Sequence, residues 1–179
     1  MTEILRHADT DPDIAACFPV MRVLRPHIAS PEELAERVRA QMLDRYRILA
    51  AWNGTMVVGL AGYRFQSNLI RGLFCYVDDL VVAPDHRRFG LGARLLDAVA
   101  TEARGANIAT EARGVNIATE ARGANIATEA RGANITTEAR GVGVKSLVLD
   151  TAMDNALGQR FYFRYGMLPG AMRFVKRLD

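Results

Sequence analysis

The stretch 76–96 constrains the fold more than any other part of the chain. Between Val77 and Val82 it is mostly apolar and β-branched, and Pro84 closes it, so it predicts a buried strand. Gly90 and Gly92 follow, directly before an amphipathic run that predicts a helix. A buried strand, a glycine-containing turn and a helix start, in this order, predict an α/β fold.

The turn between this strand and this helix has the residue types that bind an anion. The first turn of a helix leaves backbone N–H groups without partners, and its dipole favours negative charge, so glycines there let a phosphate approach closely. Arg87 and Arg88 add charge-assisted donors. The third glycine of a dinucleotide-binding turn and the Gly-Lys-Ser/Thr of a P-loop are both missing. A purely structural turn is the alternative.

The full pattern, Arg-x-x-Gly-x-Gly between a buried strand and a helix, resembles motif A of the GNAT superfamily of acyl-CoA-dependent N-acetyltransferases. The resemblance implies that the amides of the turn bind the pyrophosphate of acetyl-CoA, which serves as a co-substrate. It also implies that the backbone around Val81 and Val82 faces the pantetheine arm. The cofactor-binding residues that it assigns in the turn are Arg87, Arg88, Phe89, Gly90, Leu91 and Gly92.

The segment from Asn155 to Met167 resembles the family's motif B, N-x-x-A-x-x-F-Y-x-x-x-G-F. Gly158 stands where alanine is usual, which loosens the helix by about 1 kcal/mol, and Met167 replaces an aromatic residue. The resemblance implies that Tyr162 is the acid that protonates the departing thiolate; a half-buried core tyrosine is the alternative. Asn155 either binds the pantetheine arm or only caps its helix.

Two adjacent carboxylates, Asp78 and Asp79, lie on the predicted central strand. Neighbouring residues of a regular strand point to opposite faces, so we expect one of them to face the acceptor and the other to be structural. The one that faces the acceptor takes a proton from the amine, directly or through water, or only binds a cationic substrate. The acceptor pocket is expected from the segment 18–45 and the final hairpin, where the basic residues are Arg22, Arg25, His27 and Arg39.

The other segments predict the rest of a GNAT-like fold, with a mixed, mostly antiparallel sheet, a splayed parallel central pair and flanking helices. Before the central strand, the expected elements are a strand at 3–6, an interrupted helix at 14–24, a helix at 31–44, and strands at 46–52 and 55–65 joined by Asn53-Gly54. After the central strand and its helix, they are a parallel strand at 145–150, a helix at 155–165 and a last strand at 172–178.

A nine-residue repeat, A-T-E-A-R-G-A-N-I in its first copy, occupies residues 100–144 and interrupts what is otherwise one domain over 1–179. Nine residues span about 2.5 helical turns, so the isoleucines alternate between opposite faces and form no apolar seam. A single straight helix is excluded in a closed monomer, because the next strand must return to the sheet. A helical hairpin, a disordered loop and a helix that swaps the C-terminal half into a second protomer remain open. Glu102 and its repeats are expected to be solvated.

The composition narrows the class of protein further. With 179 residues, half of them apolar, the chain can build one ordinary core. It has no run of about 18 apolar residues and no secretory layout at its start, so no membrane contact and a cytoplasmic location are expected. Cys17 and Cys75 are read as buried structural thiols, with no metal site. The net charge of +3 and the lack of a basic, aromatic-interleaved surface predict no nucleic-acid partner.

These observations lead to one main hypothesis and one alternative. The first is an N-acetyltransferase that moves an acetyl group directly from acetyl-CoA to a primary amine of a small molecule or protein. The second is a catalytically inactive acyl-CoA-binding module whose repeats form an interaction surface. The sequence identifies neither the acceptor amine nor the oligomeric state, and a homodimer stays open.

Overall fold

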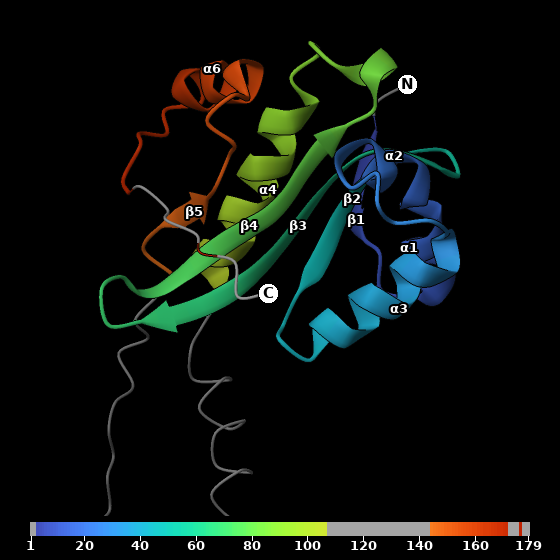
Figure 1. The fold of residues 1–179 in the computed structure, drawn as a ribbon, viewed down its shortest axis with the longest axis horizontal. Coiled ribbons are helices and arrows are strands. Elements are labelled where there is room, and N and C mark those ends of the chain that lie inside the picture. Colours follow the sequence, from blue (N-terminus) through green and yellow to red (C-terminus); the bar gives the residue numbers. More distant parts are fainter. Residues whose placement is uncertain (1–2, 107–143, 172–175, 177–179) are drawn as a thin grey trace, which may run out of the picture. The chain divides into compact units, whose positions relative to one another are not determined.

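A computed structural model describes residues 3–106, 144–171 and 176 (Figure 1). The chain divides into two compact units, unit 1 at Met1–Val148 and unit 2 at Leu149–Asp179. The predicted last strand at 172–178 and the repeat copies within 107–143 lie outside the described residues, apart from residue 176. None of the helices in the described part of the chain combines the length and the apolar character needed to cross a membrane.

Unit 1 contains most of the regular structure. Its helices are α1 (Asp11–Ala16), α2 (Phe18–Leu24), α3 (Pro31–Met42), the 3-10 turn η1 (Pro84–His86) and α4 (Leu91–Gly105). Its strands are β1 (Ile4–His7), β2 (Arg47–Asn53), β3 (Met56–Asn68) and β4 (Gly72–Val82), and β5 (Leu147–Leu149) begins in it. The central strand and the two strands before it therefore lie where the sequence places them, while β5 is shorter than expected.

The strands form one five-stranded sheet in the order β1-β2-β3-β4-β5. Neighbours from β1 to β4 are antiparallel, whereas β4 and β5 run parallel. At the start of this parallel pair, the Cys75 N–H donates to the Ser146 carbonyl at 2.9 Å. The prediction of an α/β fold with a mostly antiparallel sheet and one parallel pair is thus confirmed.

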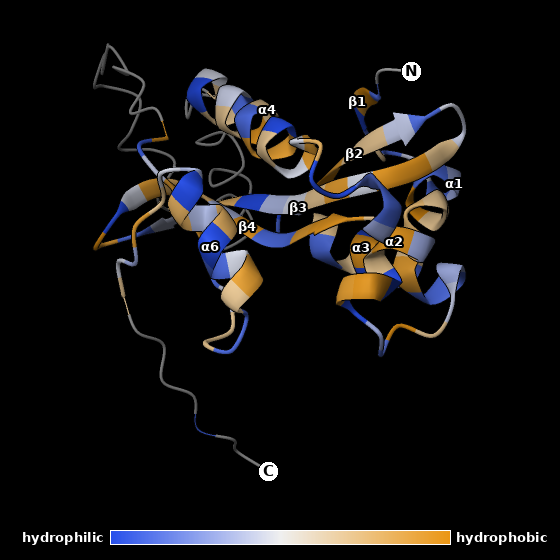
Figure 2. Ribbon diagram, turned by 90° about the horizontal axis from the view of Figure 1, so that it is seen from above, coloured by the Kyte–Doolittle hydropathy of each residue, from blue (hydrophilic) through white to orange (hydrophobic). Residues whose placement is uncertain are grey.

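Helices cover both faces of the sheet in unit 1. Figure 2 shows α4 on one side of the strands and α2 and α3 on the other, with hydrophobic segments of β2 and β3 between them. On the α1–α3 side, Ile48, Leu60 and Val81 of the sheet join a buried cluster with side chains from all three helices. Because helices pack on both faces of the sheet, β4 is held between packed layers. It therefore gives rigid support to the turn that follows Val82.

Local sequence signals explain where the helices begin and end. Proline is tolerated only in the first turn of a helix, and Pro19 lies in the first turn of α2. The predicted helix at 14–24 is therefore interrupted, and it restarts at Phe18. Ser30 caps α3, because its hydroxyl accepts from the Glu33 N–H at 3.2 Å. Glu33 in turn accepts from the Ala29 N–H at 2.7 Å, and this bond, more than the nearby Arg37, lowers the pKa of Glu33.

Helix α4 runs into the first repeat copy and ends at Gly105. Two residues of that copy contact the rest of unit 1, which corrects the expectation that Glu102 is a solvated charge. Glu102 accepts a hydrogen bond from the hydroxyl of the buried Tyr63, and its carboxylate lies 3.2 Å from the His7 ring. Ala103 is 4% exposed. The first copy is therefore part of the domain, because β1 and β3 bring His7 and Tyr63 to the last turns of α4.

Unit 2 contains the helix α6 (Ala156–Arg164). Asn155 caps it, since the side-chain oxygen accepts from the Gly158 N–H at 3.0 Å and the amide donates to Thr151 Oγ1 at 3.0 Å. A Cβ at residue 158 would lie 2.9 Å from the Asn155 Cγ, so the unusual glycine of this segment makes room for the cap. Gly166 follows the helix with φ 89°, as expected for a helix stop.

Candidate active site

The turn between β4 and α4 has the backbone of an anion-binding site. Gly90 precedes α4 with φ 78°, and no side chain caps the helix there. Arg88 also has a positive φ, 72°, which costs free energy in a residue with a Cβ and is typical of functional turns. Residues 87–90 are exposed, so the first N–H groups of α4 face solvent next to two guanidinium groups.

The residues of this turn fit a pyrophosphate. Arg87 donates from Nε to the Val82 carbonyl at 3.0 Å, so its guanidinium is held beside the end of β4. Backbone N–H groups at a helix start, joined by charged side chains, are donors that suit a phosphorylated ligand. Phe89 on the same turn is 78% exposed, whereas Leu91 is buried and anchors the start of α4. The turn thus combines solvent-exposed backbone with a buried side chain that fixes its position.

The two aspartates of β4 occupy the same face of the sheet, so the expectation that they point to opposite faces is wrong. The β3–β4 register shifts between Gly62 and Tyr63: Gly62 pairs with Asp79, whereas Tyr63 pairs with Val77. Asp78 is the extra residue of a β-bulge, which breaks the alternation of a regular strand. Both side chains therefore point toward α2 and α3.

Asp79 is buried and held by two donors. Arg25, which follows α2, donates from Nε to Asp79 Oδ1 at 2.8 Å, and the Tyr46 hydroxyl donates to Oδ2 at 2.7 Å. Burial, more than the nearby carboxylate, raises the pKa of Tyr46 well above its usual value, so the phenol keeps its proton. Arg25 also donates to the Asp78 carbonyl at 3.0 Å, which satisfies a backbone group that the bulge takes out of the ladder.

Asp78 is half-buried, and among the residues that the structure describes its carboxylate has one partner. Arg64 on β3 donates from Nε to Asp78 Oδ2 at 2.8 Å and from Nη2 to Gln41 of α3 at 2.6 Å. Burial raises the pKa of Asp78, and the attraction of Arg64 only partly opposes this. Asp78 is therefore a stronger base than an exposed aspartate.

These side chains line a cavity of about 230 Å³ between β4 and the helices α2 and α3. The cavity lies where an acceptor pocket is expected, because all of its lining residues outside β4 come from positions 21–46. Of the basic residues named from the sequence, Arg25 and His27 line it. Arg39 instead pairs with Asp11 at 2.9 Å, and Arg22 lies over the Phe18 ring.

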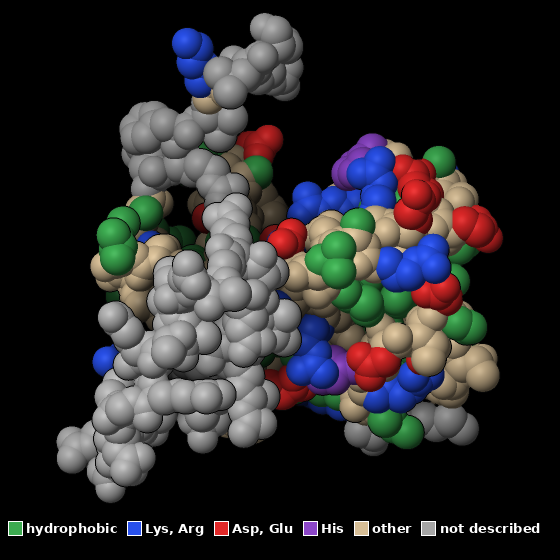
Figure 3. Space-filling view, turned by 90° about the horizontal axis from the view of Figure 1, so that it is seen from below, with side chains coloured by type: hydrophobic (Ala, Val, Ile, Leu, Met, Phe, Trp, Pro, Cys, Tyr) green, Lys and Arg blue, Asp and Glu red, His purple; other side chains and the backbone are tan. Residues whose placement is uncertain are grey.

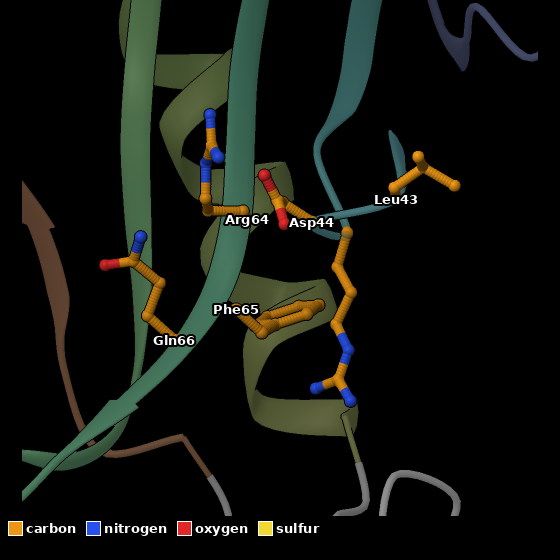
Figure 4. A pocket seen from close by; sticks show the side chains of 6 residues that line it. Leu43, Asp44, Arg64, Phe65 and Gln66 are labelled. Carbon is orange, nitrogen blue, oxygen red and sulfur yellow. The ribbon is translucent and has the colours of Figure 1, made fainter. Parts of the chain in front are cut away.

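A second hollow, of about 430 Å³, is larger but more open. It lies beside the far part of β3 and is lined by Leu43, Asp44, Arg45, Arg64, Phe65 and Gln66 (Figure 4). It contains neither of the predicted aspartates, and it shares no lining residue with the smaller cavity. The smaller cavity is therefore the candidate site.

Tyr162 and Asn155 belong to unit 2, and the other predicted site residues belong to unit 1. The Tyr162 ring packs edge-to-face on Phe161, with 5.3 Å between the ring centroids, and burial raises the pKa of its phenol. Asn155 uses both ends of its side-chain amide within its own segment, as the capping alternative expects. The roles of Tyr162 in catalysis and of Asn155 in cofactor binding stay predictions.

The remaining candidate groups have simpler roles. Cys17 and Cys75 are free and buried, and desolvation raises the pKa of each thiol to about 12, so neither is a nucleophile at neutral pH. Within the described ranges, His, Cys, Asp and Glu side chains form no group of three suited to a metal ion. On the face that Figure 3 shows, Lys and Arg side chains lie beside Asp and Glu side chains instead of gathering into one basic patch.

Sequence reasoning missed three residues that hold or make room for the groups around the two aspartates: Tyr46, Gly62 and Arg64. Tyr46 and Arg64 read as ordinary strand residues, and Gly62 as one of several small residues in β3. An isolated glycine inside a strand is a known sign of a bulge or of a close approach, and this was the one available signal. The pairing of Gly62 with Asp79 across the bulge gives it that meaning.

A mixed sheet covered by helices on both faces, with an open helix start at the end of its central strand, defines an α/β protein with an anion-binding turn. Residues 13–124 match the acetyltransferase (GNAT) family, which is more than half of the chain. The chain therefore belongs to the GNAT family. A comparison with curated protein sequences gives no match.

Solved structures share this fold along the whole chain. An acetyltransferase from Trypanosoma brucei is 19% identical with a TM-score of 0.63, and the match covers 99% of each chain. A ribosomal-protein-alanine N-acetyltransferase from Brucella melitensis biovar Abortus is 18% identical with a TM-score of 0.63, over 99% of this chain and 100% of the other. The aminoglycoside N-acetyltransferase AAC(6')-Iy in complex with CoA is 14% identical with a TM-score of 0.64, over 100% and 98%. At these identities the likeness shows the fold alone.

Proposed function

We propose that this protein is an N-acetyltransferase that transfers an acetyl group from acetyl-CoA to a primary amine of a small molecule or protein. Membership of the GNAT family supports acyl transfer. The observation that carries the proposal is the turn at Arg87–Gly92, where an uncapped helix start and two positive φ angles present donors to solvent. That backbone suits the pyrophosphate of CoA, which supplies the acetyl group as a thioester.

The residues of the chain divide the remaining work. Arg87 and Arg88 hold the pyrophosphate together with the amides of residues 90–92, and the backbone of Val81 and Val82 guides the pantetheine arm. The cavity under β4 binds the amine, and one of its two aspartates accepts a proton from it. Tyr162 is the proposed acid for the departing thiolate; its raised pKa means that the phenol carries a proton at neutral pH.

We also propose that units 1 and 2 belong to one GNAT-like domain over 1–179, with the repeats at 100–144 as an insertion. The matched structures support this, because they cover 98% to 100% of the chain. A cytoplasmic location and a homodimer stay predictions.

An acceptor screen tests the function. Purified protein is mixed with acetyl-CoA and a panel of amines, thiol release is followed, and CoA binding is measured separately by calorimetry. We expect turnover with at least one amine, and a fall in kcat of about 100-fold in Tyr162→Phe with unchanged CoA affinity. Tyr165→Phe, directly after the same helix, is the matched control.

Two results would contradict the proposal. CoA binding without turnover on any amine would favour the inactive binding module, and absence of CoA binding would remove the basis for both. If Tyr162→Phe keeps full activity, the transferase stands but the acid must be another group or water.

A further inference from the structure

We propose that the acceptor is a compact amine with a single positive charge, that its ammonium group binds Asp78 in the cavity under β4, and that Asp79 is a positioning residue. This inference rests on the proposed function and names both the substrate class and the residue that receives the amine. It follows from how the bulge, the partners of the two aspartates and the size of the cavity fit together.

Both oxygens of Asp79 are already engaged by protein donors. Arg25 occupies Oδ1 and Tyr46 occupies Oδ2, each at less than 3 Å, and the Asp79 side chain is 9% exposed. A carboxylate whose two oxygens accept from fixed donors holds those donors in place. An amine that displaced one of them would leave the displaced donor without a hydrogen-bond partner.

The lack of a side chain at Gly62 makes this arrangement possible. Gly62 pairs with Asp79 across the sheet, and the Tyr46 ring lies against its α carbon. A Cβ there would overlap the Tyr46 hydroxyl and would lie 2.6 Å from Cζ. The tyrosine therefore reaches Asp79 only because residue 62 is glycine.

Asp78 keeps one oxygen open toward the cavity. Arg64 engages Oδ2, whereas Oδ1 has no hydrogen-bond partner among the described residues, and the side chain is 24% exposed. The bulge turns this side chain to the cavity face, where a regular strand would turn it away. An ammonium group at Oδ1 completes the hydrogen bonds of the carboxylate without displacing a protein donor.

The volume and charge of the cavity limit what the amine carries. At about 230 Å³ the cavity takes one compact group, and any larger part of an acceptor would extend beyond it into solvent. Its floor is apolar, formed by Met21, Ile28, Leu34 and Val38. Each aspartate already has an arginine partner, and Arg37 and His27 also line the cavity, so no excess negative charge is present to attract a polycation. A single charge on an apolar body fits these walls.

The reaction balances with Asp78 in this role. The ammonium group loses one proton to Asp78, which passes it to solvent through the open side of the cavity. The amine nitrogen then forms a bond to the acetyl carbonyl carbon while the carbon–sulfur bond breaks, and the second proton lost by nitrogen ends on the thiol of CoA. Desolvation raises the pKa of Asp78, which favours the first transfer, and Arg64 from β3, Arg25 after α2 and Asp79 act on it electrostatically. The other titratable or charged groups that line the same cavity are His27, Arg37 and Tyr46.

The test compares amines and variants. Phenethylamine serves as the monoamine probe, with spermidine and kanamycin as polycations of small and large size. We expect kcat/KM for phenethylamine at least about 10-fold above that for either polycation. Asp78→Asn is expected to lower kcat/KM by about 100-fold and to remove the acidic limb of its pH profile. Tyr46→Phe is expected to lower kcat/KM less than 10-fold and to keep that limb, as fits a positioning role. Asp9→Asn, an exposed site outside the cavity, is the control.

Several outcomes would overturn the inference. A preference for spermidine or kanamycin contradicts the substrate class, and an unchanged acidic limb in Asp78→Asn contradicts the role of Asp78. If Asp78→Asn does not fold, the double variant Asp78→Asn/Arg64→Gln, which leaves no charge unpaired, replaces it.

Failure of the proposed function gives a different pattern. If CoA binds but no amine reacts, calorimetry with phenethylamine in the presence of CoA still decides the binding site. Binding by the wild-type protein that Asp78→Asn abolishes supports the site. Equal binding by both proteins, or none by the wild type, overturns it.

Discussion

The turn after β4 and the cavity under β4 are parts of the same strand's surroundings, yet they are built in opposite ways. The turn comes from the six consecutive residues Arg87–Gly92, is exposed, and owes its properties to backbone angles. The cavity comes from residues as far apart as Met21 and Asp79, and it owes its properties to buried side chains that hold one another. A site formed by backbone groups can be recognised from a short sequence motif, whereas a site formed by side chains from distant segments depends on the whole fold.

The contrast also predicts how each region responds to mutation. At the turn, an added side chain meets open space and acts only through the backbone conformation that it disfavours. In the cavity, an added side chain meets packed atoms and must displace a hydrogen-bonded group. The first two tests below use glycines, because each isolates one of these mechanisms, and the third removes a segment that belongs to neither region.

The largest expected effect is in the cavity. Gly62→Ala is expected to lower the free energy of unfolding by about 1–3 kcal/mol, because the new methyl group overlaps the Tyr46 ring. Gly59→Ala on the same strand is the matched control, since its Cβ meets the tips of Leu91 and Leu95 at 3.2 and 3.4 Å, which can shift. Urea unfolding measures both. An equal loss in the two variants would show that Tyr46 moves aside freely and that the cavity is not rigid.

The turn should respond less in stability and more in ligand binding. Gly90→Ala is expected to cost about 1 kcal/mol, because a residue with a Cβ is disfavoured at φ 78°, although nothing lies within 4 Å of the new atom. CoA affinity, measured by calorimetry, should fall several-fold as the turn changes shape. Gly105→Ala, also in open space but without a positive φ, should be neutral or slightly stabilising. Unchanged CoA binding in Gly90→Ala would contradict a backbone-defined site.

The smallest effect is expected from the repeats. Deleting residues 106–141 removes 36 residues but keeps Glu102, Ala103 and the helix end at Gly105. We expect kcat/KM to stay within about twofold, because both regions of the site lie outside the deleted segment, and loop shortening changes closure entropy only slightly. A loss of turnover at unchanged stability would show that the repeats take part in the site. The repeats would then be a third functional region beside the turn and the cavity.

Much of the fold and half of the site follow from short-range patterns. The buried strand that ends at Val82, the helix that begins at Pro31 and the turn at Asn53-Gly54 all rest on local signals, and each is found where it was expected. The glycine turn of Gly90 and Gly92 was readable for the same reason. The faces of Asp78 and Asp79 were not, because alternation holds only in a regular strand and a bulge depends on the partner strand. Glu102 was misread because its partners lie on two distant strands.

The sequence by itself determined that β4, its turn and α4 form an α/β unit with an open helix start, since apolar periodicity and glycine positions are properties of neighbouring residues. Only the tertiary structure decided that both aspartates share one cavity, that Arg25 and Tyr46 hold Asp79, and that Asp78 keeps an oxygen open. The physical reason is that a hydrogen bond between side chains of distant segments forms only where the fold brings those segments together, and local sequence patterns do not predict which segments these are.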